Sequence, residues 1–445
     1  MRVTTADRFA PAPGTFVEYR PESGPGERSP VPPSFNQAVH LAGGGNIWLA
    51  AVFDVPGPVD HARLAGAYRA LIARHGTLRS SFEPGPVRLR HPVPAVMHRL
   101  PGVPVSALPA LLDERCGAFG HPSYLLGVID RPDVATVLCA FDHAHVDGYS
   151  IALVIDDLRR LYDGETLPPT GDFVDHCAEQ ARLAVAPDDP RLRGWRSFFG
   201  PGEVRPPEFP LDLGVAPGET APQAVELRVL LDGAGAERFD EWCRELGARP
   251  FAGALAALAH ATHTGGGPDR LRLVFPMHTR HDERWRGALG WFTTNVPVEI
   301  PALPDPAAAT RASAAAVRAA IPLGTLPLGA VLPHLGGLAL RRGDIFMVSW
   351  IDYRTLPGAA HHDAIGARHI SAVGRADDAQ FWFSRTDSGL ALRIRYPDTA
   401  TARATIARLT ADLAKAMTER TASAPATSSS KQAVRRPIPA EPVAP

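Results

Sequence analysis

The stretch Val134–Gly148 reads VATVLCAFDHAHVDG and decides most of what can be inferred about the fold. Its first part, Val134–Phe141, is almost wholly apolar, which predicts a central strand that is covered on both faces. The polar segment Asp142–Gly148 follows directly. Apolar residues then recur at helical spacing from Ile151 to Tyr162, which predicts an amphipathic helix. A buried strand, a polar loop and a helix in this order indicate an α/β fold.

The polar loop holds the residues best suited to chemistry. A histidine at the carboxyl end of a buried strand lies where α/β proteins open their clefts, and its near-neutral pKa suits proton transfer, so His143 is the candidate base. Asp147 is placed to fix the loop through an ion pair, and Gly148 allows a close approach to the backbone. A histidine beside an aspartate is more often structural than catalytic, and we interpret His145 as structural.

Composition excludes several classes of function. The chain has 445 residues, with 46 Lys plus Arg against 47 Asp plus Glu and a net charge of -1. Such a balance provides no field to hold nucleic acid or an anionic bilayer, so neither is expected as a partner. Four cysteines without disulfide density or zinc-ligand spacing favour a reducing compartment and predict no metal site. Asp7 and Arg8 lie where a signal peptide would need an apolar run. No stretch approaches the roughly 18 apolar residues of a membrane span. We therefore expect a cytoplasmic protein without stable membrane insertion.

The order of elements along the chain predicts two lobes of similar content. Residues 1–33 are rich in Pro, Gly and charge, so we expect a flexible leader. A Pro- and Asp-rich stretch near residue 187 separates an N-terminal lobe, 34–187, which carries the polar loop, from a C-terminal lobe, 188–421. The remainder, 422–445, has the Ala, Ser, Thr and Pro composition of a disordered tail.

The loop and several other segments resemble one family. Asp142–Gly148 fits the pattern H-x-x-x-D-G of the condensation and acyltransferase superfamily related to chloramphenicol acetyltransferase, which includes the polyketide-associated acyltransferases. Asp142 replaces the first histidine of the longer form H-H-x-x-x-D-G, a departure that suits the acyltransferase branch more than peptide-forming condensation domains. Further segments match in the same order: 32–41, 71–82, 276–280, 290–298 and 393–398.

The resemblance implies an α/β fold of two chloramphenicol-acetyltransferase-like lobes, arranged as a V-shaped pseudo-dimer with the active-site tunnel between them. It implies that His143 is the general base and makes the backbone N–H of Gly148 our candidate oxyanion donor. Asp147 would be structural and paired with Arg280, in which case a charge-reversed pair would in principle restore the loop. Asp142, Trp291 and Asn295 resemble positions near the tunnel, although packing between the lobes explains Trp291 and Asn295 equally well.

The implied function is that of a free-standing acyltransferase. It would move an acyl group from a CoA or carrier-protein thioester to an acceptor hydroxyl in lipid or secondary-metabolite biosynthesis. The phosphopantetheine thioester is then substrate, and no cofactor is expected; the partners are an acyl-CoA or an acyl or peptidyl carrier protein, and a small hydroxyl or amine acceptor. Two alternatives remain: a free-standing nonribosomal peptide condensation enzyme, and a non-catalytic condensation-like module that recruits another enzyme.

Overall fold

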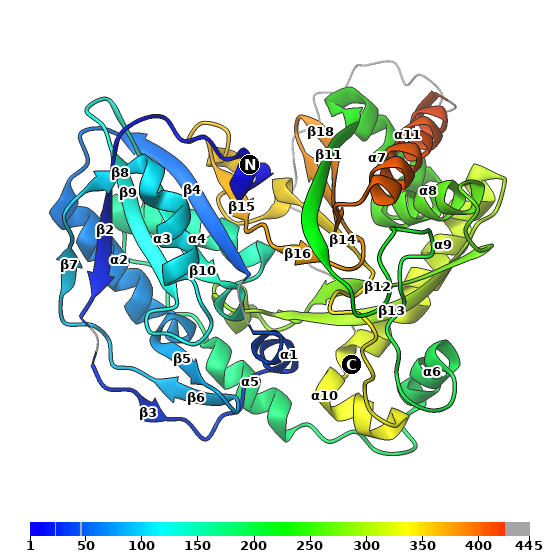
Figure 1. Ribbon diagram of the computed structural model, residues 1–445, viewed down its shortest axis with the longest axis horizontal. Helices are drawn as coiled ribbons and strands as arrows, with labels where there is room; N and C mark the ends of the chain where they lie inside the picture. The colour runs from blue at the N-terminus through cyan, green and yellow to red at the C-terminus, as the bar shows by residue number, and fades with distance from the viewer. Residues whose placement is uncertain (23, 45–46, 423–445) are drawn as a thin grey trace.

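The computed structural model describes residues 1–22, 24–44 and 47–422. Figure 1 shows two lobes side by side, each built on a large mixed β-sheet. The sheet of the first lobe has the order β1 (Arg2–Thr5), β15 (Arg368–Ser371), β4 (Trp48–Pro56), β10 (Val134–Asp142), β9 (Tyr124–Asp130), β2 (Thr15–Pro21) and β7 (Met97–Arg99), with β8 (Val103–Pro104) also paired to β2. The sheet of the second lobe has the order β13 (Thr293–Pro301), β12 (Arg270–His278), β14 (Met347–Asp352), β17 (Gln380–Thr386), β18 (Gly389–Pro397), β11 (Ala221–Asp232) and β16 (Arg375–Ala376).

Smaller elements complete the fold. A third sheet has the order β3 (Glu27–Arg28), β6 (Val87–Arg90) and β5 (Ser80–Glu83). The α-helices are α1 (Phe35–Ala42), α2 (His61–Arg74), α3 (Leu108–Arg115), α4 (Gly148–Tyr162), α5 (Phe173–Arg182), α6 (Pro190–Phe199), α7 (Gly233–Glu245), α8 (Pro250–Thr264), α9 (Pro306–Ala320), α10 (Leu328–Val331) and α11 (Ala400–Ala422). The 3-10 helices are η1 (Ala6–Arg8), η2 (Gly76–Arg79), η3 (Val105–Ala107), η4 (His143–His145), η5 (Glu283–Trp285), η6 (Ile321–Thr325), η7 (Leu332–Leu335), η8 (Tyr353–Thr355) and η9 (Ala359–His361).

Strand β10 confirms the prediction of a central, doubly covered strand. It pairs antiparallel with β4 on one side and with β9 on the other, and every residue after Val134 is buried. Because side chains alternate along a strand, Val137 and Phe141 pack with helices α2 and α4 while Leu138 and Ala140 pack with α3 on the opposite face. The polar loop is thus attached to one of the best-anchored strands of the lobe.

The expected amphipathic helix after the loop is α4. Its N-cap is Asp147, whose side chain accepts a hydrogen bond from the backbone N–H of Ser150. Ile151, Val154 and Leu158 lie on its buried face at the helical spacing read from the sequence. Capping and burial together fix where the helix begins, and so fix the end of the polar loop.

The prediction of a flexible leader in residues 1–33 was wrong for much of that segment. Strand β1 pairs with β15, and β2 lies between β9 and β7 in the first sheet. Phe16, Val17 and Tyr19 are buried, and this short apolar strand was obscured by the Pro- and Gly-rich sequence around it. The tail predicted at 422–445 lies, beyond Ala422, outside the described residues.

The lobes are not two separate halves of the chain. Strand β15 comes from the C-terminal half but joins the first sheet, where it pairs antiparallel with β4 and parallel with β1. Residues 279–292, which follow β12, also reach the first lobe: the backbone N–H of Leu289 donates to His75, and the Trp285 ring packs against His176. The crossing loop 279–292 therefore connects the lobes beside the polar loop.

Among residues 1–22, 24–44 and 47–422, no single helix is long and apolar enough to cross a membrane, although one sharply bent pair, 306–325 with 328–335, passes on length and composition together. The same part of the chain contains no group of three or more His, Cys, Asp or Glu side chains placed to hold a metal ion. The four cysteines are free thiols and all are buried.

Candidate active site

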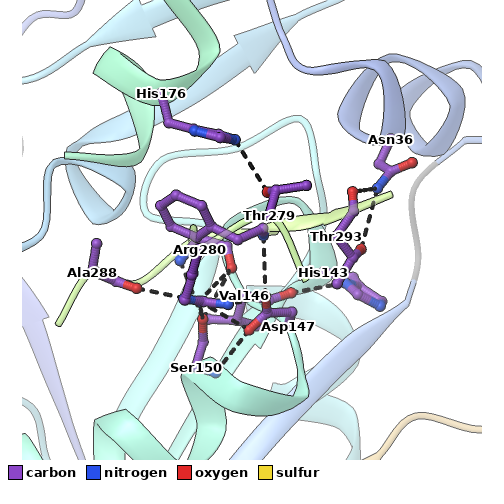
Figure 2. Close-up of polar contacts among 12 residues, drawn as sticks. Asn36, His143, Val146, Asp147, Ser150, His176, Thr279, Arg280, Ala288 and Thr293 are labelled. Carbon is purple, nitrogen blue, oxygen red and sulfur yellow. Dashed lines mark hydrogen bonds and ion pairs between the residues drawn. The ribbon is translucent and has the colours of Figure 1, made fainter. Parts of the chain in front are cut away.

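The polar loop lies where the two lobes meet, between α1 and the crossing loop 279–292 (Figure 2). The backbone N–H of Asp142 donates to Ser123, and that of His143 donates to Ile47, so the loop is held from both sides where it leaves β10. Gln37 on α1 adds a third support, because its amide nitrogen donates to the carbonyl of Ala144 at 2.7 Å. The position of His143 is therefore set by backbone contacts on several elements.

His143 presents its Nε2 atom as a proton acceptor. Nδ1 lies 2.9 Å from the carbonyl oxygen of Val146 (Figure 2). A carbonyl oxygen can only accept, so Nδ1 carries the proton in this hydrogen bond. In the neutral ring Nε2 is then unprotonated, which is the tautomer that a general base needs.

The surroundings of His143 keep it neutral. Burial lowers the pKa of His143 to about 4, and the neighbouring His40 contributes in the same direction. A ring with this pKa is uncharged near pH 7. It can therefore accept a proton without first losing one.

An aromatic and acidic cluster supports the other side of His143. The His143 ring stacks on Trp291 of the crossing loop, with 3.9 Å between ring centroids, and His40 meets the same indole edge-on. His40 Nε2 lies 3.0 Å from one oxygen of Asp142 and 3.1 Å from the other. The Asp142 side chain is fully buried and also accepts from the N–H of Ala144. Asp142 thus anchors α1 to the polar loop and holds the turn that begins at His143.

Asp147 faces away from His143 toward the second lobe. Its carboxylate pairs with Arg280 of the crossing loop at 2.7 and 3.2 Å, and both side chains are buried (Figure 2). It also accepts the backbone N–H groups of Ser150 and Phe292. Burial alone would raise the pKa of Asp147, but Arg280 and the Ser150 bond outweigh it and hold that pKa below its usual range. Both carboxylate oxygens thus accept hydrogen bonds from groups other than His143, which favours a structural role for Asp147.

The Arg280 guanidinium ties the loop to the crossing segment. It donates to the carbonyl oxygens of Ala288 and Gly290 and to the hydroxyl of Ser150, and it lies 4.4 Å from the centre of the Phe292 ring. Ser150, which the sequence does not present as a nucleophile, exchanges hydrogen bonds with Gly290 at the same point. Arg280 and Ser150 therefore lock the two lobes together beside His143.

Gly148 and Asn295 complete the set of residues singled out from the sequence. Gly148 is the first residue of α4, where backbone N–H groups have no acceptor within the helix. A Cβ atom there would lie 2.9 Å from the end of the Ile351 side chain, so a larger residue at this position would press on Ile351. Asn295 is half-buried on β13, opposite Pro276. Two residues earlier, Thr293 accepts hydrogen bonds from Asn36 of α1 (Figure 2).

Sequence reasoning missed several residues that shape the site. His40 was noted only as part of a family-like segment, yet it contacts both Asp142 and Trp291. His369 was not singled out, and Arg393 was noted only as part of the family-like segment 393–398, although burial, Arg393 and His143 all lower the pKa of His369. Their strands are far apart in the chain, so no local spacing could have drawn attention to them.

The sequence and the fold are similar to those of known acyltransferases. No protein-family model matches the sequence. Acyltransferase PapA3 of Mycobacterium tuberculosis is 23% identical over 457 residues, which cover 93% of this chain and 95% of PapA3. Trehalose-2-sulfate acyltransferase PapA2 of the same organism is 26% identical over 332 residues, covering 67% of this chain and 70% of PapA2. The solved structure of PapA2 acyl transferase superposes with a TM-score of 0.82 at 23% identity, over 95% of this chain and 100% of that chain.

The chain is thus similar, over most of its length, to members of the condensation-domain and PapA-type acyltransferase family. The first condensation domain of the calcium-dependent antibiotic synthetase, solved with a substrate analogue, has the same fold with a TM-score of 0.65 at 20% identity, over 90% of this chain and 98% of that chain. These likenesses confirm the predicted two-lobed α/β fold class, while the tunnel between the lobes stays a prediction. Homology to PapA2 and PapA3 indicates an acyltransferase, and enzymes of this class use one acyl donor and one acceptor.

Proposed function

We propose that this protein transfers an acyl group from a thioester donor to the hydroxyl of a small acceptor, with His143 as general base. The observation that carries the proposal is the state of the His143 ring. Its Nδ1 proton is committed to the Val146 carbonyl, and its lowered pKa leaves Nε2 as an unprotonated acceptor near pH 7. That state is the one needed to take a proton from an attacking hydroxyl.

The proposed reaction has two steps. The acceptor oxygen attacks the thioester carbonyl carbon while Nε2 of His143 removes the hydroxyl proton, and a tetrahedral intermediate forms. The carbon–sulfur bond then breaks, and the same proton passes from Nε2 to the departing thiolate. The products are an ester and a free thiol, so no external acid or base is consumed. Aligning donor and acceptor on either side of one fixed base supplies a large share of the acceleration, on the order of 7 kcal/mol or more.

The backbone around Gly148 is the proposed site of the negative charge that forms on the carbonyl oxygen. Gly148 opens helix α4, whose first N–H groups and positive dipole end favour an anion. Asp147 and Arg280 act as positioning residues, because their ion pair holds the start of α4 against the crossing loop. Loss of either should change the loop's geometry before it changes proton transfer.

The name of one relative supports the choice of a hydroxyl acceptor. PapA2 is named a trehalose-2-sulfate acyltransferase, so a family member acts on a small hydroxylated molecule. For this chain we propose a hydroxyl acceptor and a phosphopantetheine thioester on CoA or a carrier protein, in lipid or secondary-metabolite biosynthesis. Asp142 in place of the family's first histidine, and the higher TM-score to PapA2 than to the condensation domain, favour ester formation over peptide bond formation.

The alternative of a non-catalytic recruitment module is supported by one structural likeness. The X-domain from teicoplanin biosynthesis has the same fold with a TM-score of 0.69 at 18% identity, and another solved structure is a complex of the X-domain with OxyB. A recruitment module would not need the free Nε2 atom of His143. A peptide condensation enzyme would need that atom but would require carrier-bound partners.

The test is thiol release from a panel of acyl-CoA thioesters, with and without sugar and amine acceptors. We expect acceptor-dependent release that falls about 100-fold or more in His143→Ala, the usual scale for loss of a general base. His145→Gln is the matched control: it lies on the same turn, but its ring contacts Thr77 and Phe82. Wild-type rates in a folded His143→Ala protein would overturn the proposal.

The same assay separates the alternatives. Release from acyl carrier proteins with inert CoA thioesters, and an amide product, would identify the condensation enzyme. Silence with both donors and all acceptors, in a protein with an unchanged melting temperature, would identify the non-catalytic module.

A further inference from the structure

Arg393 is a half-buried cation that pairs with no carboxylate among the described residues. It lies on β18 of the second lobe, its Nη1 donates to the Ser371 hydroxyl on β15 at 2.7 Å, and its guanidinium lies 4.1 Å from the centre of the Trp382 ring. Its Nε is buried without a hydrogen-bond partner, and within residues 1–22, 24–44 and 47–422 no Asp or Glu lies at ion-pair distance from it. Arg385 on β17 and Arg395 on β18 each have a carboxylate, Asp240 and Asp344 respectively.

His369 lies beside this cation and also has an unused polar atom. The residue is only 5% exposed, and its Nε2 has no hydrogen-bond partner among the described residues. Nδ1 lies 3.0 Å from the Tyr353 hydroxyl. Burial raises the pKa of Tyr353, so the phenol is neutral, and the described residues offer its proton no other acceptor. The phenol therefore donates to Nδ1, and the ring proton of neutral His369 is on Nε2, where none of the described residues accepts it.

The two unused groups lie next to the proposed active site. A Cβ atom on Gly148 would be 3.7 Å from Cε1 of His369, so the ring borders the start of α4. In the first sheet, Ser371 is opposite Leu49, which is opposite Phe141 of β10. Two strand spacings separate β15 from β10, about 10 Å between backbones. An acceptor whose hydroxyl lies at His143 would need a second functional group about this far away to meet Arg393.

We propose that Arg393 and the Nε2–H of His369 form a subsite for an anionic group on the acceptor: a sulfate, a phosphate ester or a carboxylate. The inference rests on the proposed function, since it assigns the acceptor class of the same site. An oxyanion would supply the charge that Arg393 lacks and the hydrogen-bond acceptor that His369 lacks, and the positive end of α4 would add to its stabilisation. Arg393 spans from β18 to β15, so this subsite uses side chains of both sheets.

The first test uses inorganic sulfate and does not depend on catalysis. Sulfate is titrated into protein labelled with 15N at histidine, and the His369 ring signals are assigned by His369→Gln. We expect a saturable shift of the His369 Nε2–H signal in wild type and a loss of affinity of at least tenfold in Arg393→Gln. Ser371→Ala is the matched control, because it removes the hydrogen bond between the sheets and keeps the charge. If Ser371→Ala loses sulfate to the same extent as Arg393→Gln, or if wild type shows no saturable shift, the subsite is overturned.

The second test is kinetic and identifies the substrate that carries the anion. Sulfate should inhibit wild type competitively against the acceptor and not against the donor. Inhibition should be at least tenfold weaker in Arg393→Gln, and Arg393→Lys should keep part of the sulfate affinity. Parallel assays use acyl-CoA and an acyl-N-acetylcysteamine thioester, which has no phosphate. Sulfate competition that appears only against acyl-CoA would assign the anion to the donor's phosphopantetheine arm and overturn the acceptor subsite. Absence of all transfer would refute the proposed function, while the sulfate titration would still decide whether the anion site exists.

Discussion

Exchanging the charges of Asp147 and Arg280 is expected to leave the protein as damaged as either single change. The sequence alone suggests the opposite, because a reversed ion pair restores the attraction between the partners. In the structure the Asp147 carboxylate also accepts the backbone N–H groups of Ser150 and Phe292. An arginine at position 147 would place a cation against two donors that it cannot satisfy.

The other side of the pair has the opposite polarity. Arg280 donates to the backbone carbonyls of Ala288 and Gly290, so an aspartate at position 280 would face two acceptors. Removing one member of a buried pair costs about 3–5 kcal/mol. Each hydrogen bond to a charged group contributes about 1.5–3 kcal/mol, and the exchange breaks such bonds on both sides. We therefore expect Asp147→Arg with Arg280→Asp to remain more than about 3 kcal/mol below wild type in free energy of unfolding.

The assay is urea denaturation of the two single variants, the double variant and wild type, followed by tryptophan fluorescence and circular dichroism. The control is the exposed pair of Arg270 and Glu299 on β12 and β13, whose charges can be exchanged in the same way. Exposed pairs contribute about 0–1 kcal/mol, so this exchange should be nearly neutral. If the Asp147 and Arg280 double variant recovers to within about 1 kcal/mol of wild type, the backbone polarity does not control the pair and the reasoning is wrong.

Three further outcomes are expected. Because burial lowers the pKa of His143 to about 4, kcat/KM should be constant near neutral pH and should decrease only as the pH falls through about 4. A decrease that begins near pH 6.5, the ordinary pKa of histidine, would contradict the assigned environment. Trp291→Ala should lower kcat about 2- to 12-fold, because it removes a stacked pair with His143 that contributes about 0.5–1.5 kcal/mol. Trp291→Phe keeps a stacked ring and should retain most of the wild-type kcat. An unchanged kcat in both variants would show that the indole has no part in the mechanism. Gly290→Ala should lower the free energy of unfolding, measured in urea, by about 1–3 kcal/mol, because its Cβ would lie 2.3 Å from the Phe173 ring. Gly66→Ala, on the exposed face of α2, should not lower it. Equal stability of the two variants would refute the close packing at Gly290.

Much of the site's local framework could be predicted from the sequence because it is contiguous. The apolar run of β10, the polar loop and the periodicity of α4 lie within residues 134–162, and each follows from strand or helix spacing. The pairing of Asp147 with Arg280 was implied by the family resemblance, and this ion pair is present in the structure. The short strand β2 was missed because seven residues inside a Pro- and Gly-rich segment give little periodicity to detect.

By itself, the sequence determined the α/β class and the position of His143 at the end of a buried strand, since both depend on patterns between near neighbours in the chain. The two-lobed arrangement followed from the order of elements and from the family resemblance. Tertiary structure alone decided which nitrogen of His143 is free and placed Trp291 against its ring. It also brought His369 and Arg393 from separate strands to the edge of the same site. Such contacts depend on strand register and on the crossing of chain between lobes, and the burial that shifts a pKa exists only once those elements have packed.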